Sequence, residues 1–227
     1  MTFEQLTLNL PHRAAHGADD FLVSDCNLAA VRLIDSWPDW NVPVQLLIGP
    51  ASSGKTHLVR VWQAQSGARS VKSESLDIGA IDALSEGSAL VVEDADRADY
   101  DEKALFHLIN LAREKRLFVL ITARAAPRSW GCALPDLLSR LNALPAVEIG
   151  VADDALLKTV MLKHFADRQL PIDPKVLDFL ALHIERSLEA ASVAVDAVDR
   201  HALATGRKIT RQVVVEALGA AGVARPD

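Results

Sequence analysis

Several residue types are scarce in this sequence, and each shortage excludes a class of protein. Cys26 and Cys132 stand far apart in 227 residues, which is too few cysteines for a disulfide framework or a metal knuckle. We expect both to be small, reduced core residues. Aromatic residues make up only 5% of the chain, so a single-strand nucleic-acid binder built on stacked rings is not expected.

An excess of cations is also missing. The chain has 24 Lys and Arg against 30 Asp and Glu, which gives a net charge of −6. Proteins that grip duplex phosphates usually carry more cations than anions, so we expect this chain to meet DNA only indirectly. No apolar run is long enough to cross a bilayer, and the first residues lack a signal-peptide pattern. We therefore expect a cytoplasmic protein without a membrane partner.

Half of the residues are hydrophobic, and their arrangement predicts an α/β domain. Short apolar runs at residues 44–48, 89–92 and 117–121 have the length of buried strands, and residues 147–149 fit a last strand. Helical patterns fall at 56–64 and 101–115, and another helix is expected to begin after Ser24 or Asp25. Apolar strands alternating with helices predict a parallel sheet covered on both faces.

From about residue 151 only helical patterns remain, at 153–165, 176–184, 187–202 and 210–218. The predicted organisation is a tail over residues 1–20, an α/β nucleotide-binding domain over 21–150 and a small all-helical lid domain over 151–227.

One motif in the α/β part carries clear chemistry. Residues 49–56 match G-x-x-x-x-G-K-[ST] at every fixed position, between a predicted strand and a predicted helix. The glycines let successive N–H groups point at phosphate oxygens, and the following helix adds its positive end. Lys55 is expected to reach the β and γ phosphates and the Thr56 hydroxyl to ligate Mg²⁺. The predicted binding residues are Gly49, Pro50, Ala51, Ser52, Ser53, Gly54, Lys55 and Thr56.

Polar residues at the ends of two later strands suggest the rest of a phosphate site. Glu93 and Asp94 follow the apolar run at 89–92, where a P-loop protein keeps the acid that organises magnesium and the residue that orients attacking water. Glu93 is one methylene longer than the usual Asp, which is expected to weaken turnover because Mg²⁺ demands tight octahedral geometry. Thr122 ends the next strand and can face the γ phosphate. Solvated strand-end side chains are the alternative interpretation.

Taken together, these residues resemble the AAA+ ATPases of the DnaA initiator group over nearly the whole chain. Residues 49–56 are similar to the Walker A motif, 91–94 to Walker B and 121–124 to the sensor 1 strand end. Residues 133–141 are similar to the arginine-finger segment, so the resemblance implies that Arg140 acts in trans on a neighbour's ATP. It also implies a nucleotide-binding role for His57 and the sensor 2 role for Arg186. Without the resemblance, a plain surface cation is the favoured interpretation of Arg140, and a solvated helix-start residue is as good an interpretation of Arg186 as the sensor role.

The N-terminal residues carry a second likeness. Gln5-Leu6-Thr7-Leu8-Asn9-Leu10 resembles the group's clamp-binding peptide, in which Gln5 anchors one end while Leu6, Leu8 and Leu10 fill apolar pockets. A frayed edge strand is the alternative. Only residues 219–227 follow the last predicted helix, so we do not expect the DNA-binding domain of the initiator itself.

The resemblance implies a regulator of replication initiation with ADP or ATP and Mg²⁺ as cofactors. Its implied partners are the initiator DnaA and the β sliding clamp of DNA polymerase, and its own ATPase activity is expected to be weak. Two other functions stay open: a self-sufficient AAA+ ATPase that works in its own homo-oligomer, and a small-molecule kinase. The kinase lacks a visible acceptor site with a convergent base.

Overall fold

The computed structural model describes residues 22–97 and 100–222, and it contains two compact units. Residues Cys26–Val151 form an α/β unit, and Ala152–Asp227 belong to a helical unit.

A parallel sheet forms the centre of the α/β unit. Its described strands are β1 (Val44–Ile48), β2 (Arg69–Lys72), β3 (Ala89–Glu93), β4 (Phe118–Ala123) and β5 (Ala146–Glu148), in the order β2-β3-β4-β1-β5. Pairing is parallel throughout, with Val44 of β1 and Leu90 of β3 both opposite Val119 of β4. Every residue of β1 is buried, which is the pattern of a strand covered on both faces. The predicted parallel sheet is confirmed.

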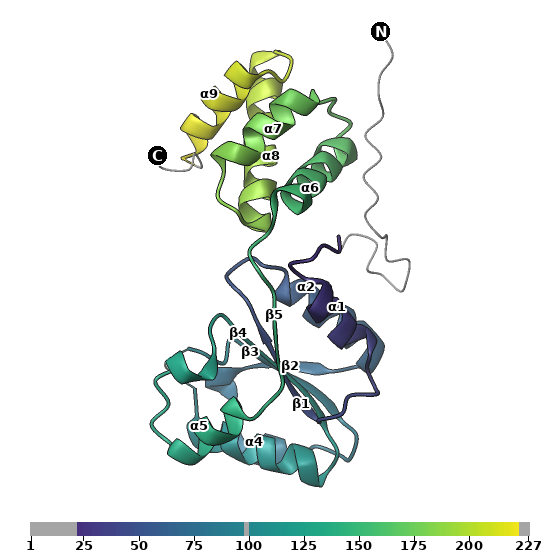
Figure 1. Cartoon of the computed structure of the whole chain (residues 1–227), viewed down its shortest axis with the longest axis vertical. Coiled ribbons are helices and arrows are strands. Elements are labelled where there is room, and N and C mark those ends of the chain that lie inside the picture. Colours follow the sequence, from purple (N-terminus) through teal and green to yellow (C-terminus); the bar gives the residue numbers. More distant parts are fainter. Residues whose placement is uncertain (1–21, 98–99, 223–227) are drawn as a thin grey trace. The chain divides into compact units, whose positions relative to one another are not determined.

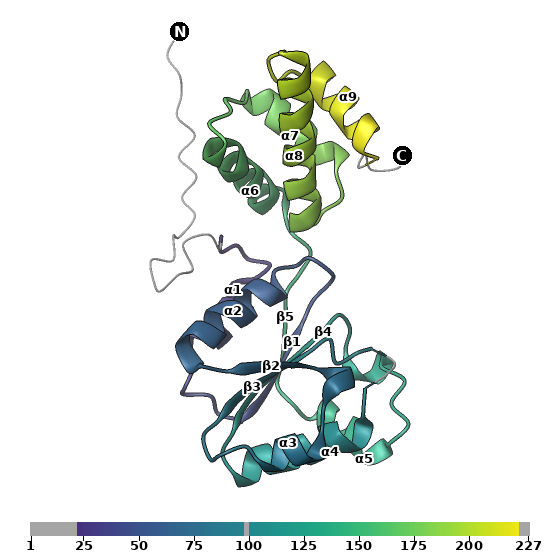
Figure 2. The same ribbon diagram turned by 180° about the vertical axis from the view of Figure 1, so that it is seen from behind.

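Helices cover both faces of this sheet (Figure 1 and Figure 2). Helices α1 (Leu28–Asp35) and α2 (Lys55–Ser66) lie along one face, and α3 (Ile78–Asp82), α4 (Glu102–Glu114) and α5 (Pro135–Asn142) lie along the other. The main core cluster joins Leu46 and Ile121 of the strands to Leu105 of α4 and Leu137 of α5. This packing fixes α5 against α4.

Some local expectations differ from the structure. The first helix begins at Leu28, with Asn27 in the N-cap position, whereas Ser24 and Asp25 precede it. Strand β2 was not predicted, because Arg69–Lys72 is polar and mostly exposed as the outermost strand of the sheet. An edge strand buries little apolar surface, so its sequence carries no apolar run.

The two cysteines are less deeply buried than expected. Neither Cys26 nor Cys132 is part of a disulfide, and each is partly exposed. Cys132 packs against the rim of the main core cluster. Neither is a full member of the core, so the expectation of buried core residues is only partly met.

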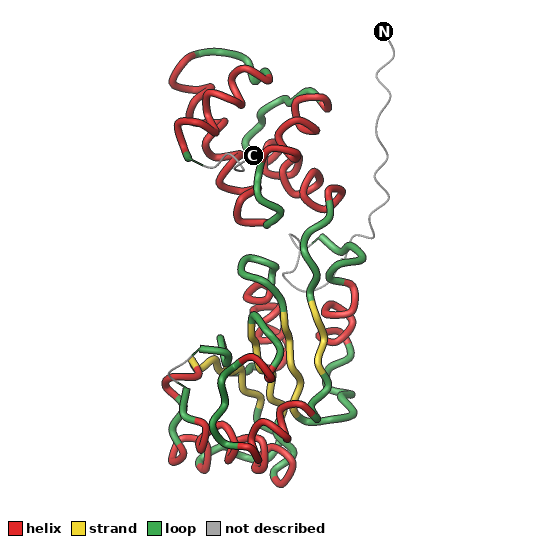
Figure 3. The backbone as a smooth tube through the Cα atoms, turned by 60° about the vertical axis from the view of Figure 1, so that its left-hand side comes forward, coloured by secondary structure: helices red, strands yellow, loops and turns green. Residues whose placement is uncertain are grey.

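The helical unit contains α6 (Asp154–Asp167), α7 (Pro174–His183), α8 (Leu188–Thr205) and α9 (Arg211–Ala221). Each of these four helices begins with a side-chain cap, at Asp153, Asp173, Ser187 and Thr210. Among described residues all strands belong to the α/β unit (Figure 3). No described helix is long and apolar enough to cross a membrane.

Candidate nucleotide-binding site

The glycine-rich loop directly follows β1 and leads into α2. Ser52 and Gly54 have φ values of 57° and 99°, so the backbone turns through the left-handed region before the helix begins. A Cβ on Gly49 would lie 2.8 Å from Ser53 Oγ and 3.1 Å from the Ile149 carbonyl oxygen. Position 49 therefore has no room for a side chain, and the loop is held tightly against the segment after β5.

Lys55 is the first residue of α2, and its side chain folds back into the loop. Its Nζ donates to the carbonyl oxygens of Gly49 (2.6 Å) and Pro50 (2.8 Å), and the residue is 8% exposed. Burial lowers the pKa of Lys55, and the Asp94 carboxylate partly offsets this. A buried ammonium at a helix N-terminus attracts anions such as phosphate.

Two more features of the loop fit a bound phosphate chain. Ser53 Oγ is buried and has no hydrogen-bond partner among the described residues, so a donor is left over inside the loop. Thr56 is exposed at the start of α2, where its hydroxyl can reach a ligand. The residues present therefore fit a nucleotide.

The strand-end residues Glu93, Asp94 and Thr122 lie at the same end of the strands as the loop, because β4 runs parallel between β3 and β1. Thr122 is buried, and its Oγ1 accepts a hydrogen bond from the Asp94 N–H at 3.1 Å. Asp94 has a φ of 53° and its carboxylate pairs with Arg97 at 3.3 Å. Thr122 thus positions the backbone of Asp94, a role that its sequence position did not indicate.

Two residues near these strand ends were not singled out from the sequence. The Ser73 hydroxyl, just after β2, donates to the Asp94 carbonyl oxygen at 3.0 Å. The Asp96 carboxylate accepts the N–H groups of Arg124 (2.8 Å) and Ala125 (3.2 Å). Both contacts join segments more than 20 residues apart, and no local pattern predicts them.

No group of three or more His, Cys, Asp or Glu side chains in the described part of the chain is arranged to hold a metal ion. Thr56 and Glu93 therefore remain predicted Mg²⁺ ligands.

Arg140 lies on α5, far from the loop in sequence. Its guanidinium stands over the ring of Phe106 in α4, 5.1 Å from the ring centroid, and its side chain is half-buried. Within residues 22–97 and 100–222 no carboxylate forms a salt bridge with it. The segment before α5 is tied to α4, because the Glu102 carboxylate accepts the N–H groups of Ala133 and Leu134 at 2.7 Å each.

Arg186 belongs to the helical unit, one residue before the N-cap of α8. It pairs with Asp154 at 2.9 Å and is half-exposed. The structure thus defines its surroundings within that unit only. The predicted clamp-binding residues Gln5, Leu6, Leu8 and Leu10 lie outside the described residues.

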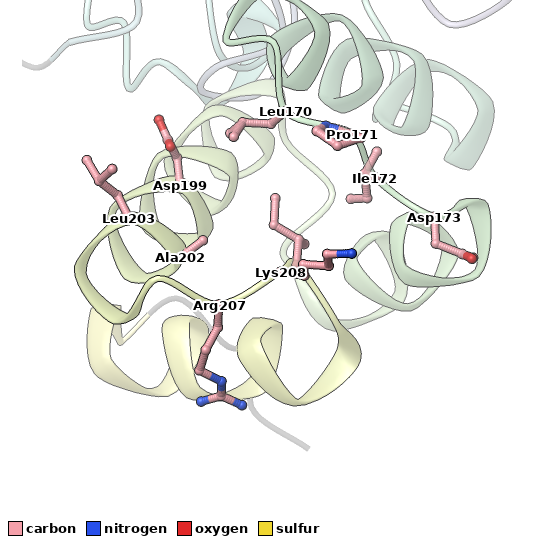
Figure 4. A pocket seen from close by; sticks show the side chains of 10 residues that line it. Leu170, Pro171, Ile172, Asp173, Asp199, Ala202, Leu203, Arg207 and Lys208 are labelled. Atoms are coloured by element: carbon pink, nitrogen blue, oxygen red, sulfur yellow. The ribbon is translucent and has the colours of Figure 1, made fainter.

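The helical unit also contains a pocket of about 550 Å³ between the α6–α7 connection and α8 (Figure 4). Its lining is largely apolar, and three of its charged side chains already have partners. Asp173 caps α7, Asp199 pairs with Arg168, and Arg207 pairs with Glu216. Lys208 is the remaining charged residue of the lining.

Several solved structures have a fold similar to that of this chain. Domain III of the replication initiation protein DnaA from Thermotoga maritima superposes with a TM-score of 0.71 at 17% identity, over 92% of this chain and 98% of that one. The replication initiator DnaA bound to AMPPCP and single-stranded DNA gives 0.68 at 14%, over 80% of this chain and 64% of that one. A mutant of Thermotoga maritima RuvB gives 0.68 at 16%, over 86% of this chain and 68% of that one. No family model matches the sequence.

The parallel sheet, the P-loop motif and the helical unit that follows match the fold of these solved structures, an α/β P-loop domain followed by a small helical domain. Its fold is similar to that of DnaA domain III over almost the whole of that domain. Identities below 20% establish the fold and leave the function to the site residues.

Proposed function

We propose that this chain is a regulator of bacterial replication initiation, of the kind that Hda represents among DnaA-related proteins. It binds adenine nucleotide at residues 49–57, attaches to the sliding clamp through Gln5–Leu10, and stimulates ATP hydrolysis by the initiator DnaA through Arg140. The initiator is thereby left with ADP.

The state of Arg140 is the observation that carries this proposal. A cation that is paired with an acid of its own chain is already neutralised. Arg140 instead rests on the Phe106 ring, half-exposed, and has no salt bridge among the described residues. Stacking on a ring holds the guanidinium in place while preserving its charge. That combination suits a cation that acts on a γ phosphate from outside.

The transition-state stabilisation that Arg140 would have to supply can be given in order of magnitude. An arginine finger accelerates phosphoryl transfer by about 10³–10⁵-fold, which corresponds to roughly 4–7 kcal/mol of transition-state stabilisation. The guanidinium stabilises charge that spreads over the γ-phosphoryl oxygens as the bond to the leaving phosphate lengthens.

The chain's own nucleotide has a separate role in this proposal. Lys55, the loop N–H groups and the Ser53 hydroxyl would hold its phosphates, while Thr56 and Glu93 would hold Mg²⁺. The proposal keeps Arg186 as a further nucleotide contact. In this proposal Asp94 orients the attacking water and Thr122 faces the γ phosphate. The longer Glu93 side chain favours slow turnover.

The deciding experiment measures hydrolysis of ATP bound to DnaA, with clamp loaded on DNA, in the presence of this chain or its variants. Arg140→Ala is expected to abolish stimulation while ADP affinity is unchanged. Arg128→Ala, another exposed arginine of the same unit, is the matched control and is expected to stimulate normally. Full stimulation by Arg140→Ala would remove that residue from the mechanism.

The same assay separates the second function. A self-sufficient ATPase would hydrolyse ATP at a robust rate without DnaA or clamp and would lose that activity in Lys55→Ala. We expect only slow hydrolysis by the isolated chain.

The clamp contact has its own test. Replacing Leu8 and Leu10 together by Ala is expected to lower affinity for the isolated clamp at least about tenfold, because two apolar side chains lose their pockets. Replacing Thr7 and Asn9 by Ala is the control and should leave affinity near that of the unaltered chain. Unchanged binding by the leucine variant would return residues 5–10 to the edge-strand interpretation.

A further inference from the structure

A second concave site lies in the α/β unit, at the opposite end of the strands from the nucleotide loop. It is a groove of about 300 Å³ whose apolar walls include Trp40, Pro43 and Phe118. Arg113 and Arg116 also line it, and we call it the arginine groove. Pro43 directly precedes β1 and Phe118 begins β4, so the groove sits at the amino ends of these parallel strands.

Its position separates it from nucleotide chemistry. The loop at residues 49–54 follows the carboxyl end of β1, and a five-residue strand is about 16 Å long at about 3.3 Å per residue. A ligand in the arginine groove is therefore too distant to touch Lys55. A ligand bound in the arginine groove would therefore be separate from the nucleotide.

The aromatic wall of the groove is rigid and already formed. Trp40 stacks on the buried Trp62 with ring centroids 5.0 Å apart, and its Nε1–H donates to the Leu33 carbonyl oxygen at 2.9 Å. Phe118 meets Trp40 edge to face at 6.1 Å. Because the indole N–H is already used, this wall presents only carbon surface to a ligand, which favours an aliphatic or proline side chain.

The two arginines determine the charge of the ligand. Arg113 lies in the last turn of α4, Arg116 directly follows the C-cap residue of that helix, and both are exposed. Neither forms a salt bridge with a carboxylate in the part of the chain that the structure describes. Lys115 stands between them in sequence but is turned away, because its Nζ donates to the carbonyl oxygens of Asp82 (2.7 Å) and Leu84 (2.9 Å). Two guanidiniums at the mouth of an apolar groove complement carboxylates that flank an apolar residue.

We propose that the arginine groove binds a short acidic segment of a partner protein, with one aliphatic or proline side chain seated between Trp40, Pro43 and Phe118 and flanking carboxylates on Arg113 and Arg116. A peptide fits better than nucleic acid because the chain is acidic overall and two cations are too few to follow a phosphate backbone. The volume admits one or two side chains, which is the size of a peptide anchor.

The test uses the full-length protein and an array of hexapeptides. Each peptide has Leu, Val or Pro between two acidic residues, and each has a twin in which lysines replace the acids. Binders from the array are measured by fluorescence polarisation at low ionic strength. We expect acidic peptides to bind and their lysine twins to bind at least about tenfold more weakly.

Charge reversal locates the contact. Replacing Arg113 and Arg116 together by Glu is expected to weaken acidic-peptide binding at least about tenfold, because both side chains are exposed and like charges then face the peptide. Replacing the exposed residues Arg60 and Arg128 by Glu changes the net charge equally and should leave peptide affinity within about twofold. Saturating ADP should also leave it unchanged, because the two sites lie at opposite ends of the strands.

Three results would overturn the proposal: no acidic peptide in the array binds, the Arg113 and Arg116 variant binds as well as the original chain, or ADP displaces the peptide. A fourth is preferential binding of a short oligothymidylate that is lost in the same variant, which would make the groove a nucleic-acid site. None of these results bears on stimulation of DnaA, so the two proposals stand or fall separately.

Discussion

At the scale of single residues, two cations of this chain have opposite surroundings. Lys55 is buried and donates to two carbonyl oxygens of its own loop, and burial lowers its pKa. Arg140 is half-exposed and rests on the Phe106 ring. The first arrangement suits a phosphate that comes into the loop, and the second suits a phosphate on another molecule. Phe106 is then the residue that keeps Arg140 oriented.

Replacing Phe106 by Leu is expected to lower stimulation of DnaA hydrolysis by roughly 2–5-fold, because a cation–π contact at an exposed site is worth about 0.5–1 kcal/mol. Phe106→Trp keeps the ring and should retain stimulation. Phe179→Leu removes the equivalent contact with Arg211 in the helical unit and serves as control. Loss of activity in the Phe179 variant alone would contradict the role given to Phe106.

At the scale of elements, α4 organises the approach to α5. Asp101 caps α4, and the next residue, Glu102, holds the backbone of Ala133 and Leu134 before α5 begins. The pKa of Glu102 is lowered mainly by the hydrogen bond from the Ala133 N–H, and further by the one from the Leu134 N–H. Burial of the carboxylate acts in the opposite direction and raises the pKa by less than the Ala133 contact lowers it.

The lowered pKa links this contact to stability. Because the pKa of Glu102 is lower in the folded chain than its ordinary value of 4.5, the ionised carboxylate stabilises the folded state fully above that ordinary value. The stabilisation is lost as the pH falls through the lowered pKa.

Glu102→Gln is expected to lower the free energy of unfolding by about 1 kcal/mol at about pH 7, which is below the usual range for a charged hydrogen bond because the site is partly exposed. The midpoint of thermal unfolding should fall by roughly 2–4 °C. The difference between variant and original should shrink below about pH 4.5 in circular dichroism melts. Glu114→Gln, at the other end of α4, is the control, and an equal effect there would show that general charge is responsible.

The regular elements were largely predictable, because burial on both faces leaves an apolar run at 44–48, interrupted by Gln45, and an unbroken one at 118–121. Edge strand β2 was not, since Arg69–Lys72 buries little surface. The loop motif at 49–56 was visible because its glycines and Lys55 are neighbours in sequence. The contacts of Glu102 with Leu134, and of Ser73 with Asp94, join distant segments and appear only in the fold.

At the scale of the whole molecule, the proposed nucleotide contacts belong to both units. Lys55 is part of the α/β unit, and Arg186 is part of the helical unit, where Asp154 pairs with it at 2.9 Å. Bound ADP is expected to stabilise the folded chain by mass action, and Asp154 competes with any anion that pairs with Arg186.

ADP at about 100 times its Kd should add about 2.7 kcal/mol to the free energy of unfolding, which is roughly 5–10 °C in the thermal midpoint. Lys55→Ala is expected to abolish the shift at the same ADP concentration, and Arg186→Ala to reduce it. Arg200→Ala, an exposed arginine of α8, is the control and should keep the full shift. A full shift in Arg186→Ala would limit Arg186 to its pair with Asp154.

The missing side chain at position 49 also has a mechanical consequence. Because Gly49 lies so close to Ile149, two residues before the α/β unit ends, the first residue of the phosphate loop is packed directly against the last residues of that unit. A ligand that shifts the backbone at Gly49 must therefore also displace the chain after β5.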